Sequence, residues 1–156
     1  MIGAFTIIKN EAPWIGYSIL STKNIVSEYC YFDGNSTDGT IEILEYLRDK
    51  KGINIKLFKG QDPKDLKDDY VRIFNDCLKQ VTAEYVWFLH PDMILVDAPK
   101  KLMFDSLACS VAMNSFAGDP GGKIMKFTEG RTGAWKSIMR NDFGLHYYGH
   151  YGVSNE

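Results

Sequence analysis

The sequence predicts an α/β fold in which a mostly parallel sheet is flanked by helices. Two observations carry this prediction. Over residues 2–89, short apolar runs alternate with amphipathic stretches in the order strand, helix, strand, helix, strand, helix, strand. The run at 85–89 is apolar throughout, as is typical of a strand buried on both faces of a parallel sheet. Together these patterns indicate a Rossmann-like arrangement.

The first strand is expected at residues 2–8, and the residues that follow carry the chemistry of a helix start. Asn10 is a candidate N-cap, and Glu11 places an acid in the first turn. Pro13 stands where a helix needs no amide donor. We therefore expect the first helix to begin at Asn10.

Three further strands and two helices complete the predicted sheet. The strands are expected at 28–32, 53–57 and 85–89. A helix at 41–51 follows the second strand and ends in cations before a glycine, and a longer helix at 66–81 follows the third strand. The last strand leads directly into the turn at Asp92.

Beyond residue 97 the alternation of strands and helices weakens. The elements expected there are a helix at 102–107 and strands at 108–116, 123–127 and 135–140. No linker or internal repeat divides the chain, so we expect a single domain over residues 1–156. Its second half is expected to be a short C-terminal α+β extension of the sheet.

The composition is that of an ordinary globular protein. Of 156 residues, 45% are hydrophobic and 24% charged, and the formal net charge of −2 provides no basic field for nucleic acid. The cysteines at 30, 77 and 109 have no metal-site spacing, which indicates reduced thiols. No run approaches the ~18 apolar residues of a membrane span, and no signal peptide is evident. We expect a cytoplasmic protein, and the alternative is a protein that acts at the inner face of a membrane.

Asp92 is the most informative residue of the chain. It follows the apolar run 85–89 and the strand-breaking Pro91. Ligands of open α/β sheets bind outside the carboxyl ends of the strands, so a carboxylate there can hold a divalent cation or a polar ligand. The alternative is an aspartate in an ordinary turn, since Pro and Asp are common turn residues.

A polar loop, Asp-Gly-Asn-Ser-Thr-Asp-Gly-Thr at 33–40, lies between the second predicted strand and its helix. Its acids, hydroxyls and glycines can contact a nucleotide, and the helix N-terminus that follows favours a phosphate. The glycines lack the spacing of a dinucleotide fingerprint or a P-loop. The alternative is a strand-to-helix turn capped by Ser36 or Thr37.

Two further pairs of residues are candidate ligand contacts. Arg72 and Asn75 lie one turn apart on a predicted helix and could point toward a diphosphate near Asp92. The alternative is that they belong to a solvated helix face. His146 and His150 are spaced i, i+4, but neighbouring glycines argue against a helix there. A histidine pair alone makes a poor metal site, so we expect one of them to complete a site begun by Asp92.

With these motifs in this order, the sequence resembles the family 2 glycosyltransferases, inverting enzymes with the GT-A nucleotide-sugar-binding fold. Four features carry the resemblance: Ile7-Ile8-Lys9-Asn10-Glu11, the loop at 33–40, the helix with Arg72 and Asn75, and the acid after Trp87-Phe88-Leu89. The resemblance implies a GT-A-like domain with a nucleotide-sugar-binding half at 1–97 and an acceptor-side half at 98–156.

The resemblance implies a hexosyl- or related transferase that moves a sugar from a nucleotide-diphospho-sugar to a saccharide, lipid-linked or protein hydroxyl. Asp92 matches the last acid of the family's Asp-x-Asp motif, which holds Mg²⁺ or Mn²⁺ at the diphosphate. His146 and His150 are further metal candidates. The implied nucleotide-sugar contacts are Lys9, Asn10, Glu11, Asp33, Asn35, Ser36, Asp38, Arg72, Asn75 and His90. The candidate catalytic bases are Asp119, Glu129 and Asp142.

Two departures from the family pattern keep other functions open. His90 occupies the place of the first acid of the metal motif, and Gly34 stands where many members carry a second acid. One alternative is therefore a catalytically incomplete GT-A-like module that binds a nucleotide or a partner. A nucleotidyltransferase would need a glycine- and lysine- or arginine-rich loop after the first strand, and Lys9-Asn10-Glu11 is not such a loop.

Overall fold

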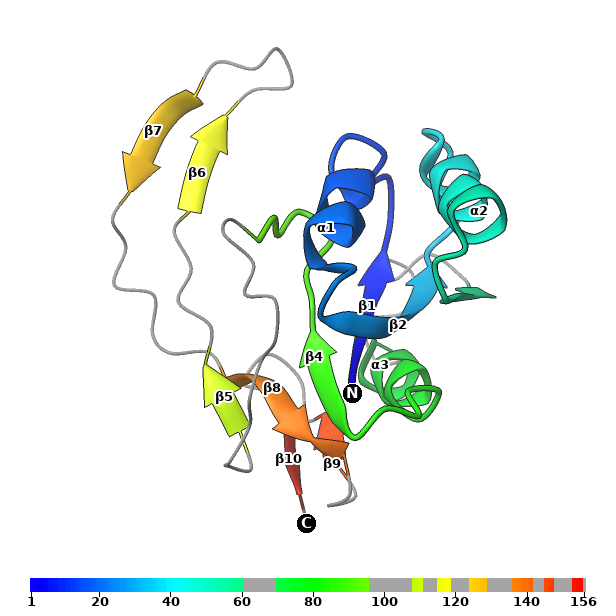
Figure 1. Cartoon of the computed structure of the whole chain (residues 1–156), viewed down its shortest axis with the longest axis vertical. Helices are drawn as coiled ribbons and strands as arrows, with labels where there is room; N and C mark the ends of the chain where they lie inside the picture. The colour runs from blue at the N-terminus through cyan, green and yellow to red at the C-terminus, as the bar shows by residue number, and fades with distance from the viewer. Residues whose placement is uncertain are drawn as a thin grey trace.

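The structure, a computed structural model, describes residues 1–60, 70–95, 108–110, 115–118, 124–128, 136–141, 145–147 and 153–155. A six-stranded sheet in the order β3-β2-β1-β4-β8-β5 forms its centre (Figure 1). The strands of this sheet are β1 (Ile2–Ile8), β2 (Val26–Asp33), β3 (Ile55–Lys59), β4 (Tyr85–Phe88), β5 (Ala108–Ser110) and β8 (Lys136–Arg140). The helices are α1 (Ile15–Thr22), α2 (Thr40–Lys51) and α3 (Tyr70–Leu78).

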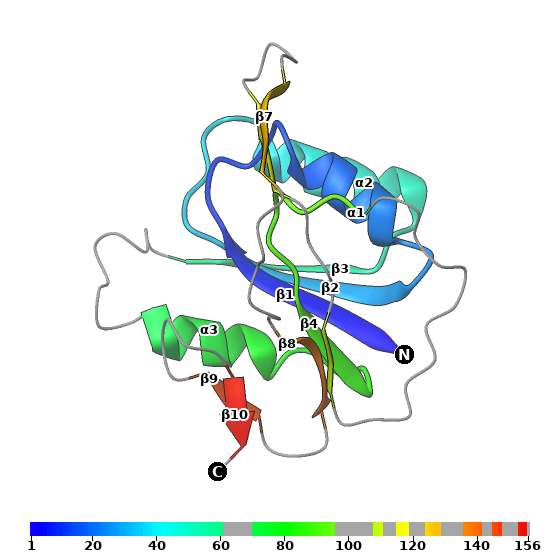
Figure 2. The same cartoon turned by 90° about the vertical axis from the view of Figure 1, so that its left-hand side faces the viewer.

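The strands β3, β2, β1 and β4 run parallel, which confirms the predicted α/β sheet. Helices α1 and α2 cover one face of the sheet and α3 covers the other (Figure 2). Each helix follows a strand and leads to the next parallel strand, so the polar loops after β1, β2 and β4 all lie at the carboxyl edge. None of the helices in the described ranges is long and apolar enough to span a membrane.

The second half extends the sheet only in part. β8 pairs antiparallel with β4, and β5 pairs antiparallel with β8, as the predicted extension requires. However, β6 (Ser115–Gly118) and β7 (Ile124–Thr128) form a separate two-stranded sheet, as do β9 (Leu145–Tyr147) and β10 (Val153–Asn155). The expectation of one strand over 108–116 is therefore wrong, because β5 and β6 belong to different sheets.

The first helix begins later than predicted. α1 starts at Ile15, with Trp14 at the N-cap position and no side-chain cap. Asn10 has a left-handed backbone with φ 56°, and the Glu11 carbonyl accepts hydrogen bonds from the amides of Trp14 and Ile15 at 3.0 and 2.9 Å. Residues 10–14 therefore form a turn ahead of the helix, and Asn10 is not its cap.

The second helix begins and ends at glycines. Its N-cap is Gly39, with φ 97°, so neither Ser36 nor Thr37 caps it. At the other end, the amide of Gly52, with φ 67°, donates to the Leu47 carbonyl. Glycine adopts such left-handed backbone angles more easily than residues with a Cβ, and the predicted glycine stop after the basic last turn is confirmed.

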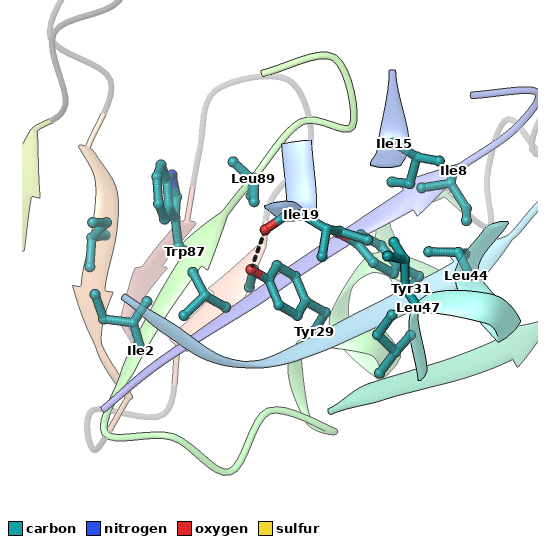
Figure 3. Packing of buried hydrophobic residues seen from close by; sticks show 14 of the residues in the cluster. Ile2, Ile8, Ile15, Ile19, Tyr29, Tyr31, Leu44, Leu47, Trp87 and Leu89 are labelled. Atoms are coloured by element: carbon teal, nitrogen blue, oxygen red, sulfur yellow. Dashed lines mark hydrogen bonds between the residues drawn. The ribbon is translucent and has the colours of Figure 1, made fainter. Parts of the chain in front are cut away.

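The face of the sheet under α1 and α2 carries the larger core. Ile15 and Ile19 of α1 and Leu44 of α2 pack with Tyr29 and Tyr31 of β2 (Figure 3). The Tyr29 hydroxyl donates to the Ile19 carbonyl at 3.2 Å. This buried polar group is therefore satisfied, and α1 is fixed along β2.

The opposite face is packed by α3. The Phe74 ring meets the Phe5 ring edge-on, with 5.0 Å between centroids. Cys77 is buried beside β2, where its Sγ donates to the Cys30 carbonyl at 3.1 Å. Both cysteines are free, and burial raises the pKa of the Cys30 thiol to about 12. Because the two faces of β1 and β2 are both covered, these strands need apolar side chains at nearly every position.

Candidate functional site

The parallel register brings three loops to one edge of the sheet. Ile8, at the end of β1, pairs with Asp33, at the end of β2. The amide of Gly34 donates to the Ile8 carbonyl at 2.8 Å, so the loops after β1 and β2 start in contact. β4 is the other neighbour of β1. The loop that contains Asp92 therefore leaves the same edge.

Asn10 joins the first loop to the second in both directions. Its backbone amide donates to Ser36 Oγ at 2.9 Å. Its side-chain Oδ1 accepts from the Thr37 amide, also at 2.9 Å. Asn10 was predicted to cap α1, and it instead ties down a loop 26–27 residues away.

Two more hydrogen bonds continue this contact toward α2. The Glu11 amide donates to Thr40 Oγ1 at 2.8 Å, and the Ala12 amide donates to Asp38 Oδ2 at 3.0 Å. Asp38 Oδ1 accepts from the Thr40 hydroxyl at 2.5 Å. Burial opposes ionisation of Asp38, but the hydrogen bonds from Thr40 and Ala12 outweigh it and lower the pKa of its carboxyl. This carboxylate is thus an acceptor for both loops.

Asp33 lies beneath the loop that it begins. Its side chain is buried, and its two carboxylate oxygens accept from the Ser36 amide at 3.1 and 3.2 Å. Its carbonyl accepts from the Gly60 amide at 3.0 Å, which ties the end of β2 to the residue after β3. Between Asp33 and Ser36, Asn35 is exposed and adopts a left-handed φ of 62°.

The Asp92 turn is held by α1. The Met93 amide donates to the His90 carbonyl at 3.1 Å and closes the turn. The Leu95 amide donates to Ser21 Oγ at 3.0 Å. The Asp92 side chain is 66% exposed, and its Oδ1 lies 3.9 Å from His90 Nδ1. Asp92 is therefore a solvent-accessible carboxylate in a turn that hydrogen bonds to α1 hold in place.

The pKa of the Glu11 carboxyl depends on acids from the other two loops. Burial, together with the negative charges of Asp92 and Asp38, raises the pKa of the Glu11 carboxyl to about 7. Within the described ranges, no three His, Cys, Asp or Glu side chains converge closely enough to hold a metal ion. A cation here would need oxygens from a bound molecule, as Mg²⁺ commonly does with phosphates.

The raised pKa gives a testable pH dependence. The folded state holds a proton on Glu11 at pH values where the unfolded chain, with a pKa of 4.5, has lost it. The free energy of unfolding should therefore fall as the pH rises from about 4.5 to 7. Glu11→Gln should flatten this decline, as measured by urea unfolding of the ligand-free protein at several pH values. An equally steep decline in the variant would show that another group titrates.

Arg72 and Asn75 do not share an environment on α3. Arg72 is 61% exposed and its Nη1 lies 3.5 Å from Asp76 Oδ2, as in the solvated-face alternative. Asn75, in contrast, is buried. Helix α3 begins near the carboxyl edge because it connects β3 to β4, so Arg72 lies in its edge-proximal turn. A diphosphate contact by either residue stays a prediction.

The remaining candidates fall largely beyond the part of the chain that is described. The base candidates Asp119, Glu129 and Asp142, and the metal candidate His150, lie outside the described residues. His146 lies on β9, which packs against α3, and its side chain is outside the described set. Lys9 is half-buried at the start of the first loop.

The sequence offered no signal for several residues that shape the site. Thr40, which accepts from the Glu11 amide, was assigned only to the polar loop. Ser18 and Ser21 look like ordinary helix residues, yet Ser18 Oγ donates to the His90 carbonyl at 3.5 Å and Ser21 Oγ accepts from Leu95. Contacts between residues 72–74 positions apart cannot be read from local patterns.

Three known proteins are similar to this chain in sequence or in fold. The chain is 52% identical over 46 residues to an uncharacterized glycosyltransferase of Rickettsia felis, a match that covers 30% of this chain and 16% of that relative. The mannosyltransferase PcManGT from Pyrobaculum calidifontis, in complex with GDP-Man and Mn²⁺, matches with a TM-score of 0.50 and 19% identity, covering 60% of this chain and 28% of that one. The structure of S. aureus TarS matches with a TM-score of 0.48 and 24% identity over 58% of this chain and 16% of TarS.

The chain thus spans less than a third of the length of each of these relatives. The likeness to the mannosyltransferase concerns the fold, and the predicted GT-A arrangement is confirmed. The sequence model of glycosyl transferase family 2 matches residues 4–102, which is more than half of the chain. This match runs from β1 past the Asp92 turn and includes all three loops of the candidate site, and the chain belongs to glycosyl transferase family 2.

Proposed function

We propose that this chain carries the donor site of a glycosyltransferase that uses a nucleotide-diphospho-sugar. The observation that carries the proposal is that the parallel register brings the loops with Glu11, Asp38 and Asp92 to one carboxyl edge. The charges of Asp92 and Asp38 add to the effect of burial in raising the pKa of Glu11. Membership of the family supports it. The PcManGT structure, which shares the fold, contains GDP-Man and Mn²⁺.

The nucleotide would lie across the loops after β1 and β2. Lys9 and Asn35 would contact it, and Arg72 and Asn75 would approach from α3. His90, which is 53% exposed beside Asp92, would lie on the side of the diphosphate. A helix N-terminus at α2 adds favourable electrostatics for the phosphates.

Asp92 is proposed to hold a divalent cation, Mg²⁺ or Mn²⁺, with diphosphate oxygens completing the coordination. The donor set fits, because carboxylate oxygens suit both ions and the neighbouring acids Glu11 and Asp38 favour positive charge. When bound, the cation supplies charge neutralisation on the nucleoside-diphosphate leaving group. One of the two candidate histidines, His146 or His150, is proposed as a further ligand.

The proposed reaction is an inverting transfer. A hydroxyl of a saccharide, lipid-linked or protein acceptor attacks the anomeric carbon as the bond to the nucleoside diphosphate breaks on the opposite side. A carboxylate accepts the hydroxyl proton, and the proposed candidates are Asp119, Glu129 and Asp142. A cytoplasmic location is proposed as well, since nucleotide-sugars are the donors.

The donor proposal is tested by a thermal-shift panel of UDP-, GDP-, CDP- and dTDP-sugars with and without Mn²⁺. At 100 times its dissociation constant, a donor should stabilise the protein by about 2.7 kcal/mol, which raises Tm by roughly 5–10 °C. A panel in which no donor raises Tm would contradict the proposal. A donor that binds but is neither hydrolysed nor transferred would favour the incomplete, binding-only module instead.

A further inference from the structure

Four hydrogen bonds join the loop after β1 to the loop after β2. We call them the loop lock. The donors and acceptors are Asn10 N to Ser36 Oγ, Thr37 N to Asn10 Oδ1, Glu11 N to Thr40 Oγ1, and Ala12 N to Asp38 Oδ2. Their lengths are 2.8–3.0 Å, and each bond crosses between segments 26–29 residues apart.

The lock uses polar atoms that a nucleotide would otherwise contact. Asn10 contributes its amide and its Oδ1. Ser36 contributes its hydroxyl, and its amide is already bonded to Asp33. Asp38 contributes both carboxylate oxygens, one to Ala12 and one to Thr40. A ligand that took these atoms would have to break bonds that hold the two loops together.

Two other groups on the same loops are not used in this way. The lock takes the Glu11 amide, while the Glu11 carboxylate has no hydrogen-bond partner among the residues described. The exposed side chain of Asn35 likewise makes no hydrogen bond within the described ranges. These two side chains are available to a ligand without any loss of loop structure.

We propose that Asn10, Ser36 and Asp38 are positioning residues that preorganise the loop 34–39, and that Asn35 and the Glu11 carboxylate are the groups that face the donor. This inference rests on the proposed donor function. Preorganisation increases affinity by removing the cost of ordering a loop when the ligand binds. The lock thus contributes to donor binding without touching the donor.

Asn10 and Asn35 form a matched pair for the test. Both are exposed asparagines with left-handed backbones, φ 56° and 62°, so glycine fits either position without backbone strain. Asn10→Gly removes the acceptor of the Thr37 amide, whereas Asn35→Gly removes no loop bond among the described residues. Asn10→Asp retains a side-chain oxygen for that amide and serves as the conservative variant.

The experiment combines hydrogen exchange of the ligand-free protein with calorimetric titration of UDP and GDP in the presence of Mn²⁺. In Asn10→Gly the Thr37 amide should exchange about 3–10 times faster, the factor expected for loss of one ordinary hydrogen bond. Asn10→Asp should restore slow exchange, and Asn35→Gly should leave it close to wild type. Affinity for the preferred nucleotide should fall by a similar factor in both glycine variants.

The outcomes separate this inference from the proposed function. If Asn10→Gly weakens nucleotide binding with unchanged exchange at Thr37, Asn10 is a direct contact and the inference is wrong. If exchange accelerates but affinity stays the same, the lock has no role in binding and the inference is equally wrong. If wild type binds neither nucleotide while Asn10→Gly still accelerates exchange, the lock exists and the donor function fails.

Discussion

Asp92→Asn is expected to lower the rate of sugar transfer by about a hundredfold or more. A cation at a leaving diphosphate contributes several kcal/mol to the transition state, and each 1.36 kcal/mol is about tenfold in rate. Asparagine retains the size and one oxygen of aspartate but loses the charge that binds the cation. The Asp92 side chain is mostly exposed and makes no hydrogen bond within the described ranges that holds the fold, so Tm should stay unchanged.

The decisive measurement is a Mn²⁺ titration of nucleotide affinity. In the wild type, Mn²⁺ should tighten binding of UDP or GDP, and in Asp92→Asn this gain should disappear while metal-free affinity remains. Asp49→Asn is a suitable control, because Asp49 is an exposed acid paired with Arg48 on α2, away from the three loops. An undiminished Mn²⁺ effect in Asp92→Asn would show that the cation is bound by other residues.

The parallel half of the fold could be predicted because its signals are local. Apolar runs and helical spacing placed β1, β2, β4 and α2, and Gly52 marked the end of α2. The loops after β1, β2 and β4 could be assigned to one edge because parallel strands end together. The family resemblance, in contrast, was needed to assign Glu11 and Asp38 to the same site as Asp92, and the raised pKa of Glu11 agrees with that grouping.

The start of α1 was predicted wrongly because long-range bonds override local capping. Asn10 has the right chemistry for an N-cap, but its Oδ1 accepts from Thr37 rather than from its own helix. In isolation the segment Asn10–Trp14 gives no indication of this competition. Contacts that join the first and second loops depend on the strand register, which a sequence pattern does not fix.

The sequence did not show which side chains of α3 face the sheet, for a related reason. Arg72 and Asn75 are three residues apart, which places their side chains about 300° around the axis and near each other. The boundary between the buried and exposed sides of α3 nevertheless runs between them, with Asn75 buried and Arg72 in solvent. Only the packing of Phe74 and Cys77 on the sheet determines where that boundary lies.

Glu28→Ala is expected to reduce the free energy of unfolding by about 2–4 kcal/mol, mainly because two backbone amides before β4 lose their acceptor. Glu28 is buried on β2, and its Oε2 lies 2.8 Å from Lys56 Nζ. Its Oε1 accepts from the amides of Thr82 and Ala83, both at 2.6 Å. Alanine would leave these amides without their acceptor, whereas Lys56 would keep its hydrogen bond to the Gln80 carbonyl.

The acid side of the stability curve provides a second readout for Glu28. Burial acts to raise the pKa of its carboxyl, but the hydrogen bonds from Lys56, Thr82 and Ala83 outweigh it and lower the pKa below 4.5. The stabilisation is therefore complete above pH 4.5 and is lost as the pH falls through the lowered folded-state pKa. Urea unfolding from neutral to acid pH should show the gap between wild type and Glu28→Gln closing in that window.

A substitution at Glu28 should change the stability of the protein without changing donor binding. It lies at the amino end of β2, opposite the edge that carries the three loops, and joins β2 to the segment before β4. The folded fraction of Glu28→Gln should therefore bind nucleotide with wild-type affinity, although its Tm is lower. The exposed Glu84, in the same segment, is the control, and Glu84→Gln should change neither quantity. A weaker nucleotide affinity in folded Glu28→Gln would instead show that this ion pair transmits strain to the donor edge.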